Sequence, residues 1–481
     1  MKYILPKKAI FIAALLFVIL GFSNSQIAIS QQTSKVTSRI EERNVRAQME
    51  FLAGDALQGR GSGTQFEWLA AQYIASQLRQ FAVEPAGETD SSGGKTYIQT
   101  INITKNSFEE TPKLSYNSNN QPVILEHGRE MILMRLNTGQ INGALQKINL
   151  DEKPKVGAVA FIKLRESDDV QKVMQKLQSF STSGASAVIV EETPQLRSQW
   201  SNFAARKISF TTISNNTGNT FNLIAVSKEA ANALVQIADG TSIEIKGKLA
   251  APQSQKTWNA VGMIKGSDAV LSSEVILLSA HLDHLGMRQD TPGEDKIYNG
   301  ADDDASGCVA VLELARVLAS GKRPKRSVYF AFFGSEEAGG YGSQYFVSNL
   351  SFPKDKLAAN LQFEMIGRPD AKVGADELWL TGYDRSNLGP ELAKQGAKLV
   401  NDPHPEQNFF QRSDNYTLAR QGVIAHTVSS FGLHTDYHRV SDEIKTIDFN
   451  HMTRAINSMV KPVRWLINSN FKPVWFEGKK P

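Results

Sequence analysis

Three adjacent aspartates stand where a helix is expected to begin. Asp302, Asp303 and Asp304 lie in the segment "NGADDDASGCVAVLELARVLA", just before an apolar run with helical spacing. The start of a helix needs only one capping carboxylate, and three neighbouring negative charges repel one another. The segment is therefore either a solvated turn with one capping residue or part of a site that binds something strongly positive.

Histidines and carboxylates also gather in four other short motifs of the C-terminal half. They are His281, Asp283 and His284 in "AHLDHLG", Glu336 and Glu337 in "GSEEAGG", Glu364 in "LQFEMIG", and His434, Asp436 and His438 in "FGLHTDYHRVSDE". A lone histidine or a lone pair of glutamates is usually a structural or solvated group. Because seven of the eight histidines lie between residues 281 and 451, we interpret the motifs together.

Apolar strands are predicted immediately before three of the motifs. They span Val275 to Ala280, Ser327 to Phe333 and Ala359 to Phe363, and a helix from about Ser306 to Ala319 separates the first two. Alternating apolar strands and helices predict an α/β sheet covered on both faces. Ligands of such sheets bind beyond the carboxyl ends of the strands, so the motifs are expected to converge there.

The combination of two histidines with three carboxylates suits zinc, with manganese or cobalt as alternatives. A carboxylate that bridges two ions would create a two-metal site, with the ions roughly 3.5–4 Å apart. Such a site lowers the pKa of a bound water and polarises a carbonyl group. A glutamate next to a ligand glutamate could then take the proton of the water.

Five motifs resemble, in the same order, those of the M28 family of zinc aminopeptidases. They are "AHLDHLG", "NGADDDASG", "FFGSEEAGGYGS", "NLQFEMIGR" and "DYHRVSDE". The segment "EFLAGDALQGRGSGT" near the start is similar to the N-terminal segment of that family, so the resemblance covers nearly the whole mature chain. It implies a mixed, mostly parallel sheet flanked by helices, the zinc exopeptidase type of α/β fold.

The resemblance also implies how two zinc ions would be held. His281, Asp303 and Glu364 would hold one ion. Asp303, Glu337 and His438 would hold the other, so Asp303 would bridge the two ions. Relatives often carry a cis peptide bond after the bridging aspartate, which here is the bond between residues 303 and 304.

The same resemblance implies roles for residues around the ions. Glu336 would be the general base. Asp283 would form a hydrogen bond with His281 and fix the tautomer of its ring. The remaining members of the motifs would be bystanders or pocket residues: Asp302, His284 and His434.

Two positions depart from the pattern of the family. Glu364 stands where many relatives have aspartate, which changes the reach of that carboxylate. Asn415 in "RSDNY" stands where relatives often have histidine, and we expect an altered substrate pocket with activity retained. Nearby apolar residues either line that pocket or belong to the core: Phe409, Phe410, Phe431 and Leu433.

The region from 105 to 255 differs in character from the rest of the chain. It contains short β-like runs, "GAVAFIKL" and "SAVIVEE", with one predicted helix between them. The region is similar to a protease-associated (PA) domain, and an unrelated β-rich insertion is the alternative. The peptidase domain is then expected at residues 35–104 and 256–475, and residues 37–85 are predicted to be helical.

The first 26 residues have the layout of a secretory signal peptide, in which lysines precede the apolar run Ala9 to Phe22. This run is short for a membrane span, so we expect export to the periplasm or the extracellular space, with a retained N-terminal anchor as the alternative. The formal net charge is only +4, which argues against a nucleic-acid partner. The single cysteine, Cys308, excludes a disulfide within the chain and is predicted to be a small core residue.

The implied function is that of an exported aminopeptidase, which releases N-terminal residues from peptides through a water activated by two zinc ions. A carboxypeptidase or dipeptidase of the same fold is an alternative, for which Arg368, Arg385 and Arg412 could bind a substrate carboxylate. A glutaminyl cyclase-like enzyme and a non-catalytic ectodomain are further alternatives. The complete set of candidate ligands argues against both of these.

Overall fold

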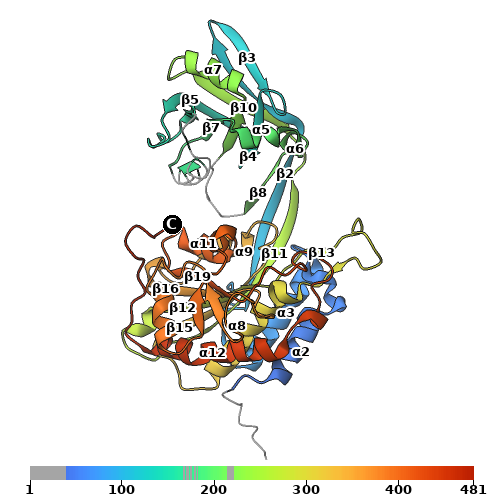
Figure 1. Ribbon diagram of the computed structural model, residues 1–481, viewed down its shortest axis with the longest axis vertical. Helices are drawn as coiled ribbons and strands as arrows, with labels where there is room; N and C mark the ends of the chain where they lie inside the picture. The colour runs from blue at the N-terminus through green and yellow to red at the C-terminus, as the bar shows by residue number, and fades with distance from the viewer. Residues whose placement is uncertain are drawn as a thin grey trace, which may run out of the picture. The chain divides into compact units, whose positions relative to one another are not determined.

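The computed structural model describes residues 39–481, apart from 166–167, 169–172, 174–175, 178–179, 181–182 and 214–221 (Figure 1). The expected signal peptide lies outside the described residues, and so does most of the helix expected between the two β-like runs. In the described ranges, every helix is too short or too polar to cross a membrane.

A mixed sheet forms the centre of the peptidase-like part. Its strands lie in the order β2 (Ile98–Ser118), β11 (Gln253–Ile264), β15 (Ser327–Phe333), β12 (Val275–His281), β16 (Leu357–Phe363), β19 (Ala425–Ser429), β17 (Leu378–Leu380) and β18 (Leu399–Asn401). The four strands from β15 to β19 are parallel, whereas β11 and β17 run antiparallel to their neighbours in this group. This is the mixed, mostly parallel sheet expected from the sequence.

Helices cover both faces of this sheet (Figure 1). One face packs on α2 (Glu42–Leu52), α3 (Gln65–Gln80), α8 (Gly307–Ala319) and α12 (Phe449–Asn468). The other face packs on α9 (Tyr341–Ser348) and α11 (Asp414–Ala419). Strands β12 and β15 are buried at every position, because apolar side chains on both faces of each strand meet a helical layer. Cys308 is buried in α8, as predicted.

The expectation of one helical stretch over residues 37–85 is wrong between α2 and α3. The chain there forms a short helical turn (Asp55–Arg60) and a glycine-rich loop. Gln58, Gly59 and Arg60 all have positive φ angles, which an α-helix does not accommodate. Thr64 then starts α3, since its side-chain oxygen accepts a hydrogen bond from the backbone N–H of Phe66.

The region from 105 to 255 has strands and a hydrophobic core of its own. Its strands are β3 (Gln121–Glu126), β4 (Met131–Arg135), β5 (Gln140–Ile148), β6 (Val159–Ile162), β7 (Ala187–Glu191), β8 (Ser209–Ile213), β9 (Leu223–Val226) and β10 (Ser242–Leu249). Its described helices are α5 (Pro194–Ser198), α6 (Trp200–Ala204) and α7 (Lys228–Gln236). The two β-like runs of the sequence are β6 and β7, which lie parallel and contribute Phe161 and Ile189 to this core.

Strands β2 and β11 are continuous across the positions expected as domain boundaries. They pair in antiparallel register from Ile98 with Ala260 to Lys105 with Gln253. The chain therefore leaves the central sheet and returns to it on two neighbouring strands.

Candidate metal centre

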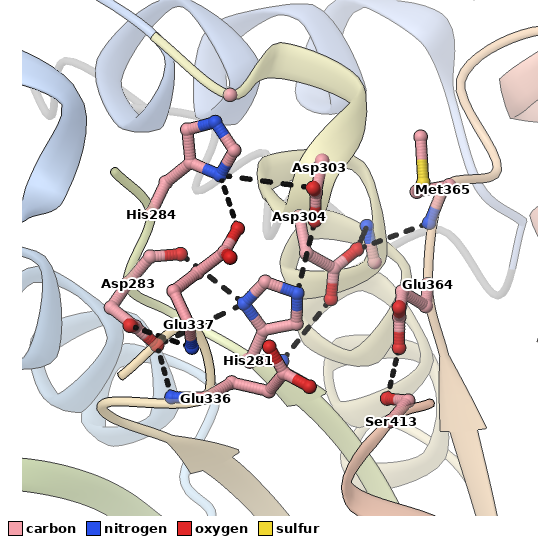
Figure 2. Close-up of polar contacts among 12 residues, drawn as sticks. His281, Asp283, His284, Asp303, Asp304, Glu336, Glu337, Glu364, Met365 and Ser413 are labelled. Carbon is pink, nitrogen blue, oxygen red and sulfur yellow. Dashed lines mark hydrogen bonds and ion pairs between the residues drawn. The ribbon is translucent and has the colours of Figure 1, made fainter. Parts of the chain in front are cut away.

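Three parallel strands deliver candidate ligands to one edge of the sheet. Strand β12 ends at His281, which is in register with Phe333, the last residue of β15. Glu336 and Glu337 follow β15 after a tight turn, and Glu364 directly follows β16. The expected convergence at the carboxyl ends of the strands is thus present in the structure (Figure 2).

Asp303 lies between two groups of residues that could each hold a metal ion. The first group is His281, Asp303 and Glu364, and the second is His284, Asp303 and Glu337. Asp303 Oδ1 is 3.1 Å from His281 Nε2, while its Oδ2 is 3.2 Å from His438 Nε2. One carboxylate therefore uses its two oxygens on two sides, as a bridging ligand would.

Two histidines contact the carboxylate of Glu337 in the second group. Oε1 of Glu337 lies 3.2 Å from Nε2 of His438 and 2.9 Å from Nδ1 of His284. His438 was expected here and His284 was not. His284 was a candidate in "AHLDHLG", but the resemblance left it out of the ligand set. The orientation of its side chain depends on a loop that is distant in sequence.

The three adjacent aspartates make different contacts and have different roles. They lie in a wide helical turn (Ala301–Ser306) that leads into α8, and the peptide bond between Asp303 and Asp304 is cis. Of the three, only Asp303 belongs to the two candidate metal groups. The carboxylate of Asp304 accepts hydrogen bonds from the backbone N–H groups of His281, Gly307 and Met365. Asp303 alone of the three therefore faces the candidate metal groups, while Asp304 holds the surrounding backbone.

Asp302 belongs to a network on the far side of the turn. Its carboxylate accepts hydrogen bonds from the N–H of Gly367 and from Ser306, and it lies 3.0 Å from Nε2 of His434. Asp442 accepts hydrogen bonds from the backbone N–H groups of Asp302 and Asp303 at 3.1 Å. This network fixes the backbone from which Asp303 reaches the metal groups.

Asp283 does not contact His281 in the way that the sequence suggested. Its carboxylate lies 3.8 Å from Nδ1 of His281, whereas Nδ1 is 3.2 Å from the backbone carbonyl oxygen of Asp283. The carboxylate instead accepts hydrogen bonds from the backbone N–H of Glu336 at 2.9 Å and from Ser62 at 2.5 Å. Asp283 therefore positions the turn that carries Glu336, while its carbonyl group orients the ring of His281.

The glycine-rich loop between α2 and α3 holds the ligand loops in place. Arg60, which is buried, donates hydrogen bonds to the carbonyl groups of Leu52, Leu282, Asn299 and Gly300. The loop precedes the region from 105 to 255, yet its partners at 282–300 follow that region. Sequence reasoning missed this role, and one arginine within a glycine-rich stretch was the only available signal.

Glu67, at the start of α3, supports the other ligand turn. Its buried carboxylate accepts hydrogen bonds at 2.8 Å from the backbone N–H of Ser335 and from the hydroxyl of Thr257. Ser335, which has a positive φ angle, directly precedes Glu336. The backbone conformation that presents Glu336 is thus stabilised by a carboxylate from the N-terminal segment.

The centre collects more negative charge than its own side chains can neutralise. Burial raises the pKa of Glu336 well above its ordinary value, and the charges of Asp414 and Glu364 add to this effect. Although burial opposes it, contacts with His281 and His438 hold the pKa of Asp303 well below its usual range. Cations at the two candidate groups would relieve this repulsion.

A cavity opens beside Glu364. Its apolar lining consists of Met365, Trp379, Phe409, Phe431 and Tyr437, and polar groups come from Thr381, Arg412, Ser413, Thr427 and Ser429. Phe409 and Phe431 are therefore pocket residues, whereas Phe410 is buried in the core and Leu433 is exposed.

Asn415, one of the two positions that depart from the expected pattern, is buried behind this cavity. Its side-chain oxygen accepts a hydrogen bond from the hydroxyl of Thr427, one of the lining residues. Its amide N–H₂ group donates to the carbonyl oxygen of Phe410. Asn415 therefore acts on the pocket through Thr427.

Comparison with known proteins identifies a family for the C-terminal part. Residues 259–462 match the profile of Peptidase family M28. A probable leucine aminopeptidase 2 of Aspergillus oryzae is 27% identical over 42% of this chain and 39% of its own length. Aminopeptidase YwaD of Bacillus subtilis is 25% identical over 62% of this chain and 61% of its own length. The chain therefore spans about two to three fifths of the length of these relatives.

A solved structure, described as that of a zinc aminopeptidase from Bacillus subtilis, aligns with 90% of this chain and 97% of its own, at 19% identity and a TM-score of 0.46. The matched residues 259–462 include the carboxyl ends of strands β12, β15 and β16, together with His281, Asp303, Glu337, Glu364 and His438. Through these residues, the C-terminal part of the chain is similar to peptidase family M28.

Proposed function

We propose that this protein is an exported, zinc-dependent aminopeptidase that releases N-terminal residues from peptides. The observation that carries the proposal is the position of Asp303, whose two oxygens serve two separate groups of candidate ligands. The names of the relatives, several of which are aminopeptidases, support the same activity. Export rests on the layout of the first 26 residues.

The residues of the centre fit two zinc ions. One ion would be held by His281, Asp303 and Glu364, and the other by Asp303, Glu337 and His438. Oε1 of Glu337 is buried and has no hydrogen-bond partner among the described residues, which is expected of an oxygen that ligates a cation. Bound zinc would supply Lewis acidity, which makes a water molecule more acidic and a peptide carbonyl more electrophilic.

Glu336 would move the proton in the reaction. Its backbone N–H is held by Asp283, and the preceding Ser335 is held by Glu67, so the turn presents the carboxylate in a fixed place. As general base, Glu336 would take the proton of the attacking water and then pass it to the amine that leaves the cleaved bond. The two transfers balance, because the water supplies a hydroxyl group to the new carboxylic acid and a proton to the amine.

The cavity beside Glu364 would receive the side chain of the N-terminal residue. Its walls are mostly aromatic, so large apolar side chains are the expected preference. Zinc analysis of the purified protein, with hydrolysis of a panel of aminoacyl-anilides, tests the proposal. We expect about two zinc ions per chain, release that stops when a chelator is added, and faster release of leucine or phenylalanine than of alanine. Protein that binds no zinc when zinc is supplied would contradict it.

Carboxypeptidase activity is a second candidate, which Arg412 favours. Arg368 contacts Asp436 and Asp442, and Arg385 donates to the carbonyl oxygen of Lys479. Arg412 lines the cavity and has no carboxylate partner in the part of the chain that the structure describes. Peptides with a blocked N-terminus and a free C-terminus test this candidate, and hydrolysis of such peptides that Arg412→Ala abolishes would favour it.

We also propose that residues 105–255 form a PA-like inserted domain within a discontinuous peptidase domain at 35–104 and 256–475. The separate hydrophobic core of the inserted region supports this division. Limited proteolysis, followed by mass spectrometry of the fragments, tests it: cleavage is expected near the two boundaries before it occurs inside either core.

A further inference from the structure

His284 is completely buried at the candidate metal centre without a hydrogen bond for either of its ring nitrogens. Its exposed fraction is 0%, and Nδ1 and Nε2 both lack a hydrogen-bond partner among the described residues. Leaving a buried polar group without a partner costs free energy. A buried ring of this kind therefore requires an explanation.

The ring points at the oxygens of the second group (Figure 2). Nδ1 lies 2.9 Å from Oε1 of Glu337 and 3.8 Å from Oδ2 of Asp303. The contact with Glu337 is short, and both of its atoms are buried. A buried nitrogen that faces two carboxylate oxygens is placed as a ligand of a shared cation would be.

The separations between these atoms also fit ligation. Atoms bound at 2.0–2.2 Å to one tetrahedral zinc ion lie about 3.3–3.6 Å from one another. Nε2 of His438 lies 3.2 Å from both Oε1 of Glu337 and Oδ2 of Asp303, and Nδ1 of His284 lies 2.9 and 3.8 Å from the same two oxygens. These contacts scatter around that range, so the four atoms lie near enough to one another to face one ion.

The fold makes room for the ring at this place. The backbone N–H of His284 donates to the carbonyl oxygen of Arg60, and Gly61 forms a β-bridge with His284. Gly300 has a positive φ of 59°, and a Cβ atom there would lie 2.5 Å from Cγ of the His284 ring. A residue larger than glycine at 300 would push the ring away from Glu337.

We propose that His284 is a fourth protein ligand of the second ion, through Nδ1. This inference rests on the proposed two-ion function. The second ion would then have two imidazoles and two carboxylates, whereas the first would have one imidazole and two carboxylates. The second ion is consequently the more tightly held, and the first keeps an open position for water and substrate.

The test separates a ligand from a hydrogen-bond donor that merely orients Glu337. His284→Gln keeps an N–H donor but is a poor ligand for zinc, and His438→Gln is the matched control on the same ion. Affinity is measured by chelator competition with the full-length protein, and the cobalt-loaded protein gives a visible absorption spectrum of the site. Removal of an orienting partner weakens metal binding 10–100-fold.

For His284→Gln we expect at least a 100-fold loss of affinity for one of two ions, a similar loss for His438→Gln, and a changed cobalt spectrum. In His284→Ala, added 1-methylimidazole should restore the lost affinity, because it can ligate a metal but has no N–H to donate. Two ions in the wild type with a smaller loss for His284→Gln would overturn this inference alone. Fewer than two ions in the wild type would overturn the proposed function, and the His284 ligand with it.

Discussion

Acidification should destabilise this protein through His426, a buried histidine on β19 next to the cavity-lining residue Thr427. Its Nδ1 lies 2.7 Å from the carbonyl oxygen of Thr381, and its Nε2 lies 2.7 Å from Oγ of Ser386. The neutral ring satisfies both contacts, because Nδ1–H donates to the carbonyl group and Nε2 accepts from the hydroxyl group. Burial lowers the pKa of His426 from 6.5 to about 4.

The sign and size of the effect follow from this shift. The folded protein binds a proton at His426 less readily than the unfolded chain does, so this contribution to stability is complete above pH 6.5 and is lost as the pH falls towards 4. Relative to neutral pH, the free energy of unfolding should fall by about 2 kcal/mol at pH 5 and by about 3 kcal/mol at pH 4.

Urea unfolding of the wild type and of His426→Gln between pH 7 and pH 4 measures this contribution. Metal release and the other titrating groups affect both proteins alike, so the difference between the two unfolding free energies isolates His426. The wild type should lose about 3 kcal/mol more than the variant across this range. A difference that stays constant with pH would refute the reasoning, because His426 would then take no part in acid unfolding.

Three further changes test the centre and its supports. Glu336→Gln should keep both metal ions while kcat falls by about 10²–10⁴-fold, because an amide cannot accept the proton of water; metal content that falls in step with kcat would contradict this. Trp379→Ala should raise KM for leucyl and phenylalanyl substrates by about tenfold or more, with alanyl substrates as the control; equal effects on all substrates would place the N-terminal side chain elsewhere. Arg60→Lys should lower the free energy of unfolding by about 3 kcal/mol or more, because lysine cannot reach four carbonyl groups at once; unchanged urea denaturation would show that the loop is held by other contacts.

The strands that carry the ligands could be predicted from local sequence. Runs such as Ser327–Phe333 are apolar at nearly every position, and a strand covered on both faces needs that composition. The edge at which the ligands meet then followed from the parallel order of the strands. Glu336 and the five expected ligands were placed by motif, and four of those ligands belong to the candidate metal groups while His438 lies beside them.

The supports of the centre depend on contacts across the chain and could not be predicted in this way. The guanidinium of Arg60 reaches carbonyl groups that are more than 220 residues away in sequence. The position of His284 depends on that loop and on the small size of Gly300. Periodicity and local motifs carry no information on such pairs, so the role of Arg60 and the placement of His284 emerged only from the fold.

The register of β2 and β11 determines whether the segment between these two strands can be inserted or removed as a unit. Lys105 and Gln253 are partners on adjacent antiparallel strands, so the 147 residues between them begin and end at neighbouring points. A two-residue Asn-Gly turn can close the same gap as a β-hairpin without shifting any pair from Ile98 to Lys105. The strand pair is thus a natural graft point, at which modules can be exchanged while the metal centre keeps its scaffold.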